Sequence, residues 1–244
     1  MPDQPVPWPA SVQRWQNLTF LHWSYDPAVV QSLLPPGLTV QEWDGVTWVG
    51  ITPFRMMGVR APALPPPPGW GEFPELNVRA YVRGPDGRDG IRFLVMAVPR
   101  LSFLAAMRVI GLPYERSRSD VSVDGSRWAY RFEPPRRAQG TASRFDAVVE
   151  VGEMVPEQER TPLVDSLTGR WSGFHRRGGV LWRTPIAHEP WPLRTATAHG
   201  DLTGPLLWAG LSAPEGQAVV HAASVVHTSL GPPRPVQRTR PVRQ

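Results

Sequence analysis

The amino-acid sequence predicts an α+β protein that is mainly β, an antiparallel β barrel or bent sandwich with two or three packing helices. Segments of alternating apolar and polar residues recur along the chain, and tight-turn pairs such as Asp44-Gly45 and Asp124-Gly125 separate them. The 30 Pro and 22 Gly among 244 residues disfavour long helices. No internal repeat or interdomain linker stands out, so one closed or bent sheet around one core is the expected architecture.

Turn and capping signals divide the chain into elements. The expected strands are residues 17–25, 38–43, 46–56, 73–82, 90–98, 116–123, 126–133, 142–151, 179–188, 193–199 and 217–230. The expected helices are residues 27–34, 99–110 and 162–174, with a short irregular or helical piece near residue 206. Residues 1–230 are expected to form a single domain. Residues 231–244 contain four Arg and no acid, and are expected to form a disordered, basic, Pro-rich tail.

Two amino acids are missing from the composition, and each omission removes a class of chemistry. Without Cys the chain has no disulfide, no thiolate nucleophile and no Cys-ligated zinc. All 26 basic residues are Arg, so no Lys side chain can form a Schiff base with a carbonyl substrate. The sequence contains no local metal-binding motif, phosphate-binding loop or G-x-S-x-G nucleophile elbow, and we therefore expect neither a metal nor a cofactor.

Charge and hydropathy bear on partners and compartment. The formal net charge is +5, but four Arg belong to the tail, so the body is nearly neutral and no nucleic-acid partner is expected. No run of 18 apolar residues occurs, so we expect no membrane partner. The N-terminus lacks the basic and apolar regions of a signal peptide, which predicts a cytoplasmic protein. The oligomeric state is left open, and a homo-oligomer is one possibility.

The strand at residues 73–82 carries the candidate site. Successive side chains of a strand point to opposite faces, so Glu75, Asn77, Arg79 and Tyr81 share one face, with four apolar residues on the other. The apolar face is expected to pack against a core. Two interpretations of the polar face remain open at this point. It points to solvent, or it points into a barrel, where its four groups converge on a ligand.

Six short strings carry a resemblance to a known family. They follow one another in the order expected for it, and they are F-L-H-W at 20–23, L-P-P-G-L at 34–38, D-G-V-T-W-V-G at 44–50, E-L-N-V-R-A-Y-V at 75–82, L-P-Y at 112–114 and H-E-P-W-P-L at 188–193. Through these strings the chain resembles the YqjF-like family of uncharacterised bacterial proteins, also called domain of unknown function 2071.

That family is similar to the acetoacetate decarboxylase-like superfamily, whose fold is a β barrel or cone around a small-molecule cavity. The resemblance implies that the polar face of strand 73–82 turns inward. It also limits the chemistry, because acetoacetate decarboxylase works through a lysine imine and this chain has no lysine. A shared fold does not by itself carry a function.

On an inward face, the polar residues have candidate roles. Arg79 would bind an anionic or carbonyl oxygen and Glu75 would move a proton, which makes them the candidate catalytic residues. The candidate ligand contacts are His22, Asn77, Tyr81 and Trp48. Structural alternatives stay open, namely an ion pair between the first two residues and a hydrogen-bonded core histidine.

Three function hypotheses of different class result. The first is binding of a small carbonyl- or carboxylate-bearing molecule in an enclosed pocket, with proton-transfer or lyase-type chemistry that needs no Schiff base, such as isomerisation or dehydration. The second is a non-catalytic ligand-binding or sensing protein with the same pocket. The third and weakest is a nucleic-acid binder that uses the Arg-rich tail. The sequence does not identify the ligand.

Overall fold

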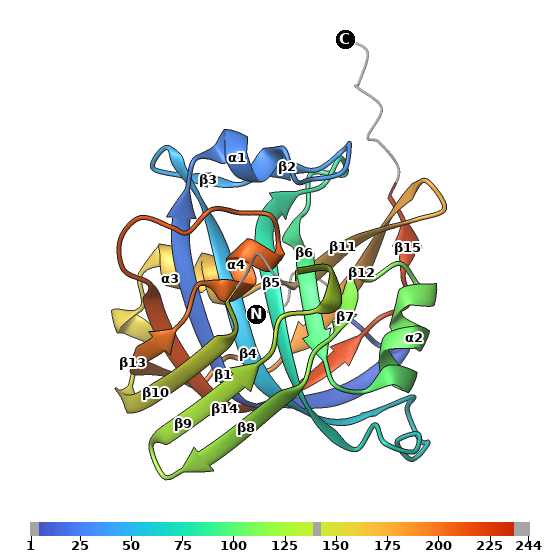
Figure 1. Ribbon diagram of the computed structural model, residues 1–244. Coiled ribbons are helices and arrows are strands. Elements are labelled where there is room, and N and C mark those ends of the chain that lie inside the picture. Colours follow the sequence, from blue (N-terminus) through green and yellow to red (C-terminus); the bar gives the residue numbers. More distant parts are fainter. Residues whose placement is uncertain (1–4, 139–142, 237–244) are drawn as a thin grey trace.

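One sheet of fifteen strands makes up most of the computed structural model, which describes residues 5–138 and 143–236 (Figure 1). At its centre β1 (Ser11–Tyr25), β4 (Val46–Arg60) and β5 (Glu72–Arg83) are antiparallel neighbours. The order continues from β5 through β6, β11 and β12, and from β1 to β14. These four strands are β6 (Asp89–Val98), β11 (Ser172–Arg177), β12 (Val180–His188) and β14 (Val219–Leu230).

Pairing between β12 and β14 closes these seven strands into a ring, so the predicted, mainly β fold contains a barrel. All neighbours in the ring are antiparallel except β6 and β11, which pair in parallel. Closure leaves no free edge in the ring and gives it an inside and an outside. The inward faces of its strands surround the candidate site.

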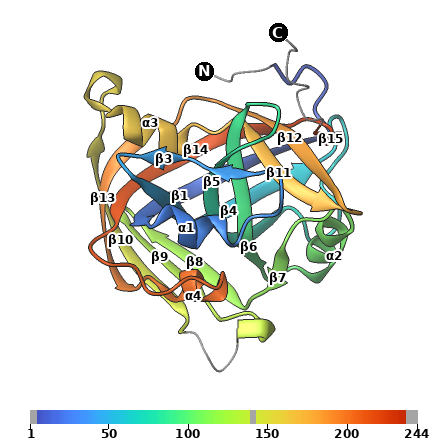
Figure 2. The same cartoon turned by 90° about the horizontal axis from the view of Figure 1, so that it is seen from above.

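A second group of strands continues from β14 and covers the outer face of the central strands. It runs antiparallel in the order β13 (Leu193–Asp201), β10 (Phe145–Met154), β9 (Arg127–Phe132) and β8 (Ser119–Asp124). Figure 2 shows this group on one side of β1 and β4, with β11 and β12 on the other. The apolar face of β5 packs here in one buried cluster, whose members include Val78, Ala80, Trp128, Phe132 and Phe145. The core predicted for that face is therefore present.

Short elements complete the chain. The remaining strands are β2 (Thr39–Val40), β3 (Glu42–Trp43), β7 (Tyr114–Arg116) and β15 (Arg234–Pro235). The helices are α1 (Pro27–Gln31), α2 (Leu101–Val109), α3 (Pro162–Thr168) and α4 (Gly204–Trp208), with 3₁₀ turns η1 (Arg136–Ala138) and η2 (Glu157–Glu159). Asp26 and Thr161 cap α1 and α3 by accepting a hydrogen bond from a backbone N–H in the first turn, as predicted.

The structure differs from the sequence-based expectation in three segments. The helix expected over 162–174 ends at Thr168, because residues 172–177 form β11 and pair with β12. The strand expected over 38–43 is two short pieces. Residues 231–236 were expected to belong to a disordered tail, but β15 pairs with β12 and the Val236 N–H donates to the Leu181 carbonyl at 2.8 Å. Residues 237–244 lie outside the described residues.

Candidate ligand-binding site inside the barrel

The polar face of β5 points into the ring of seven strands. Glu75 is 1% exposed and Arg79 is 5% exposed, although each would prefer water when charged. Tyr81 packs there in a cluster with side chains from across the ring, namely Ile186 of β12 with Trp15, Trp48 and Leu230 at its margin. The interpretation in which this face points to solvent is therefore wrong.

A hydrogen-bonded network joins three of the predicted residues to α3. The His22 Nε2 atom lies 2.6 Å from the Tyr81 hydroxyl, and the Arg79 Nε–H donates to the same hydroxyl at 3.1 Å. The Tyr81 hydroxyl donates to the Leu167 carbonyl at 2.8 Å, and Arg79 Nη2 donates to that carbonyl at 3.1 Å. Because Tyr81 has a single hydroxyl hydrogen, His22 must be the donor through Nε2.

Gly50 makes this network possible. The pairing of β1 with β4 places it opposite His22, and the pairing of β4 with β5 places it opposite Arg79. A Cβ atom at this position would lie 2.9 Å from His22 Cδ2 and 3.0 Å from the Tyr81 hydroxyl oxygen. Any side chain would therefore push apart the shortest hydrogen bond of the network. Gly50 ends one of the family-like strings, but its purpose depends on this three-dimensional contact.

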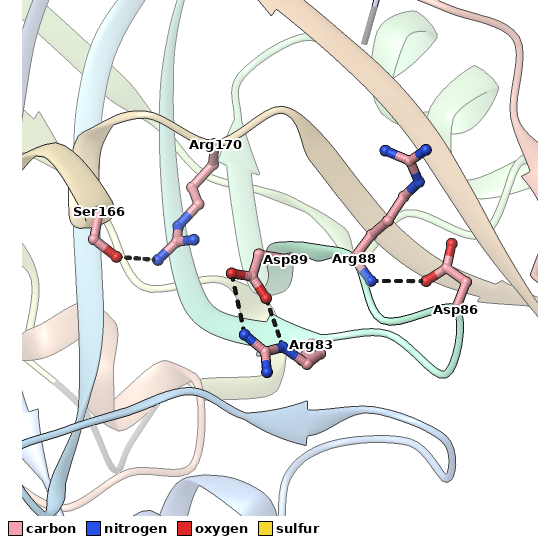
Figure 3. A network of polar contacts seen from close by, with 6 residues as sticks. All are labelled: Arg83, Asp86, Arg88, Asp89, Ser166 and Arg170. Carbon is pink, nitrogen blue, oxygen red and sulfur yellow. Dashed lines mark hydrogen bonds and ion pairs between the residues drawn. The ribbon is translucent and has the colours of Figure 1, made fainter. Parts of the chain in front are cut away.

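Arg170, from the segment between α3 and β11, adds a second cation to the same place. Its guanidinium carbon lies 5.1 Å from the centre of the Tyr81 ring, and that of Arg79 lies 5.6 Å from it. Figure 3 shows Arg170 near the Arg83–Asp89 ion pair, with its guanidinium bonded to Ser166. Burial lowers the pKa of Arg170, while its Nε atom is buried without a hydrogen-bond partner.

We call His22, Arg79, Tyr81 and Arg170 the cationic cluster. Within the described residues neither of its guanidiniums forms an ion pair with a carboxylate, and Arg79 instead lies 5.0 Å from the Phe20 ring centre. Burial first, and the nearby Arg79 second, hold the pKa of His22 well below its ordinary value, so its imidazole is neutral at pH 7. The cluster thus has an excess of positive charge inside the barrel.

Glu75 lies in a different environment. Burial raises its pKa to about 8, although a hydrogen bond donated by the Tyr114 hydroxyl at 3.1 Å works in the opposite direction. The carboxyl group is therefore mostly protonated at pH 7. Its surroundings are a largely apolar cluster that includes Phe54, Phe73 and Phe103. No ion pair between Glu75 and Arg79 occurs in the part of the chain that the structure describes, so the structural ion pair considered above is not formed.

Unpaired polar atoms lie between the cationic cluster and Glu75. The Asn77 Oδ1 and Thr52 Oγ1 atoms are buried without a hydrogen-bond partner, and these two residues are direct neighbours across β4 and β5. The Trp48 Nε1 atom is also buried and unpaired. Buried polar atoms without partners are uncommon and mark places where a ligand or water would be stabilised. Asn77 and Trp48, both predicted ligand contacts, thus retain hydrogen-bonding capacity toward the interior.

The sequence did not single out several parts of the site. Arg170 and the Leu167 carbonyl come from a segment far from β5 in the chain, so no local pattern links them to it. Thr52 could have been found, since it lies on the same face of its strand as Gly50.

Two pockets, of about 740 Å³ and 340 Å³, are lined by other residues and contain no member of the cationic cluster.

Among residues 5–138 and 143–236, no group of three or more metal-ligating His, Asp or Glu side chains is present. None of the helices described is long and apolar enough to cross a membrane.

Comparison with known proteins gives a family and a fold. The model of the uncharacterised conserved protein family DUF2071 matches residues 12–227. The chain is 29% identical over 212 residues to the uncharacterised protein YqjF of Bacillus subtilis (strain 168), and the match covers 86% of each chain.

Solved structures of low sequence identity share the fold. The enduracididine biosynthesis enzyme MppR complexed with pyruvate has a TM-score of 0.64 at 15% identity, over 97% of this chain and 94% of MppR. An acetoacetate decarboxylase-like enzyme from Sphingomonas wittichii RW1 has a TM-score of 0.65 at 12% identity, over 98% of each chain. Acetoacetate decarboxylase from Legionella pneumophila has a TM-score of 0.63 at 16% identity, over 97% of this chain and 92% of the decarboxylase chain. These likenesses show an acetoacetate decarboxylase-like fold.

Proposed function

The chain belongs to DUF2071, the family of uncharacterised conserved proteins whose model it matches, and from this premise we propose that it binds a small carbonyl-bearing organic acid inside its barrel. The reaction class that we propose is proton transfer next to the carbonyl group, without a Schiff base. The absence of lysine excludes imine formation by a side chain, which leaves acid–base chemistry as the route.

One observation carries this proposal. Arg79 and Arg170 are buried guanidiniums that have no carboxylate partner among the described residues. A buried unpaired charge is expensive, and a guanidinium binds a carboxylate through two parallel hydrogen bonds. Both Arg79 and Tyr81 donate to the single carbonyl of Leu167, a neutral acceptor that does not balance the charge of the guanidiniums. An organic acid would supply the missing negative charge.

The similar structures support a carbonyl acid as the ligand class. MppR has been solved with pyruvate, and acetoacetate decarboxylase is named for a 3-oxo acid. In the proposed complex Arg79 and Arg170 hold the carboxylate beside Tyr81, whose hydroxyl accepts the His22 Nε2–H, and the ligand extends along β5 so that its carbonyl group lies near Glu75. Glu75 exchanges the proton, because its pKa of about 8 lets it act as acid or base near neutral pH. Asn77 and Trp48 supply the remaining hydrogen bonds.

A non-catalytic ligand-binding role is the second candidate, and a specific observation favours it. Glu75 accepts a hydrogen bond from Tyr114 of the cluster around Phe73 and Phe103, and burial and Tyr114, rather than Arg79, shift its pKa. Arg79 lies four positions after Glu75 on the extended strand, or about 13 Å along β5. A ligand held only by the cationic cluster would therefore be bound without contact to the proton donor.

Calorimetric titration with pyruvate and acetoacetate tests the binding site. Arg79→Met should weaken binding about 10- to 100-fold, the loss expected when hydrogen bonds to a charged group are removed. Arg83→Met is the matched control, because it removes the same charge from an exposed residue paired with Asp89. Equal affinity in the wild type and in Arg79→Met would rule out the proposed site.

Proton exchange separates the two candidate functions. In D₂O, an enzyme of the proposed class accelerates loss of the ¹H signal next to the carbonyl of the bound acid, and Glu75→Gln abolishes that acceleration while keeping affinity. A binding protein leaves the signal at its uncatalysed rate. Exchange that persists at the wild-type rate in Glu75→Gln assigns the proton transfer to another group.

A further inference from the structure

A pocket of about 740 Å³ lies outside the barrel, at the outer face of the β8–β9 hairpin. None of the residues that line it belongs to the cationic cluster, so the two sites are separate. Its wall carries four arginines and two carboxylates, namely Arg116, Arg118, Arg131, Arg136, Asp120 and Glu133. We call it the arginine pocket.

Most of its cations lack partners. Arg131 pairs with Asp146 at 3.2 Å. Across residues 5–138 and 143–236, no ion pair or side-chain hydrogen bond engages Arg116, Arg118 or Arg136. The two carboxylates of the pocket offset only part of the charge of its four guanidiniums. Its wall therefore has a surplus of positive charge, and three of its guanidiniums have all their donors available.

Backbone hydrogen bonds fix the positions of these arginines. The buried Ser117 side chain, between two of them in the sequence, donates from Oγ to the Glu133 carbonyl at 2.6 Å. The Ser117 N–H donates to the Val98 carbonyl at 3.0 Å, and the Glu133 N–H donates to the Arg118 carbonyl at 2.9 Å. The register of the β8–β9 hairpin fixes the backbone position of Arg131 on β9, opposite Asp120. These hydrogen bonds fix the backbone of the wall, and the arginine side chains extend from it toward solvent.

We propose that the arginine pocket binds a small polyanion with neighbouring phosphate or carboxylate groups. A guanidinium offers parallel N–H donors that match both groups, and four of them exceed the charge of a single carboxylate. The pocket volume lies within the roughly 300–1,000 Å³ range of small-molecule sites. A pocket of about 740 Å³ holds a compact anion but not the length of a nucleic-acid strand, which favours a small ligand.

Titration calorimetry with pyrophosphate and with citrate tests the proposal and distinguishes a phosphate ligand from a carboxylate ligand. The variant carries Arg118→Gln and Arg136→Gln, both surface changes outside the barrel. The matched control carries Arg83→Gln and Arg127→Gln, which removes the same charge from two exposed arginines that pair with Asp89 and Glu150. Thermal unfolding of both double variants verifies that they remain folded.

We expect saturable binding of at least one probe by the wild type, at least tenfold weaker binding by the pocket variant, and less than twofold change in the control. Tighter binding of pyrophosphate indicates that the natural ligand carries phosphate groups, and tighter binding of citrate indicates that it carries carboxylate groups. The proposal is overturned if neither probe saturates, if both double variants weaken binding equally, or if a single-stranded RNA oligonucleotide binds at this pocket and the small anions do not.

Discussion

Replacing Glu75 by Gln tests whether the barrel encloses a protonated carboxyl group. Burial raises the pKa of Glu75 to about 8, whereas its ordinary value of 4.5 applies to the unfolded chain. Between these values the folded protein keeps a proton that the unfolded chain releases. Stability rises with pH only where the unfolded state binds more protons, so this group makes the folded state less stable as pH increases through that window. Gln has no proton to release, and its carbonyl oxygen can still accept the Tyr114 hydroxyl.

The expected size follows from the pKa values. Each pH unit inside the window changes the free energy of unfolding by about 1.4 kcal/mol, with the slope levelling near the upper pKa. Between about pH 6.5 and about pH 8, Glu75 should therefore remove about 2 kcal/mol of stability. The buried histidines also have shifted pKa values, but they are the same in both proteins and cancel in the difference between wild type and Glu75→Gln.

Urea unfolding followed by tryptophan fluorescence, at both pH values, measures this difference. As the pH is raised, we expect the free energy of unfolding of Glu75→Gln to increase by about 2 kcal/mol relative to that of the wild type. Glu72→Gln is the control, because this carboxylate is half exposed and pairs with Arg55 at the surface. Its pH dependence should follow that of the wild type. If Glu75→Gln also follows the wild type, Glu75 is not buried as a neutral acid and its proposed role in proton transfer is lost.

Further expectations concern single positions. Gly50→Ala should lower the free energy of unfolding by about 1–3 kcal/mol through overpacking against the imidazole and phenol beside it. Gly173→Ala, whose Cβ would meet nothing closer than 3.6 Å, should change it by less than about 0.5 kcal/mol, and equal effects in urea unfolding would contradict the packing argument. Trp191→Phe should cost about 1 kcal/mol and speed amide exchange in α3, because its indole N–H donates to the Thr168 carbonyl at 2.9 Å. Arg79→Met should leave the thermal midpoint unchanged or raise it, since a buried unpaired charge is removed, and a large drop would show that Arg79 is structural.

Local sequence patterns predicted what depends on neighbouring residues. Alternation assigned both faces of β5, and the caps Asp26 and Thr161 marked the starts of α1 and α3. Patterns failed where pairing is between distant segments. The expected helix extended to residue 174, but pairing with β12 and β6 makes residues 172–177 a strand. Residues 231–236 have the composition of a disordered tail, yet β15 joins the edge of β12.

In the candidate site, too, local patterns predicted what neighbouring residues determine and missed what distant segments contribute. The spacing of Glu75 and Arg79 on one strand already implied about 13 Å between their Cα atoms, so their separation followed from strand geometry. Arg170 could not be found in this way, because it approaches Tyr81 from the end of α3. Gly50 belongs to one of the family-like strings, but the need for glycine there comes from the close approach of His22 and Tyr81, which lie on different strands.

The distance between the cationic cluster and Glu75 leads to a last prediction about ligand length. A guanidinium stays charged and does not act as a nucleophile, so Arg79 and Arg170 can hold a carboxylate but cannot replace a catalytic lysine. Pyruvate held there is too short to reach a carboxyl group about 13 Å further along β5. A longer oxo acid passes the unpaired oxygens of Asn77 and Thr52 before it reaches Glu75. We therefore expect proton exchange in D₂O to increase with chain length across a series of oxo acids, and exchange that is fastest for pyruvate would exclude Glu75 as the group that moves the proton.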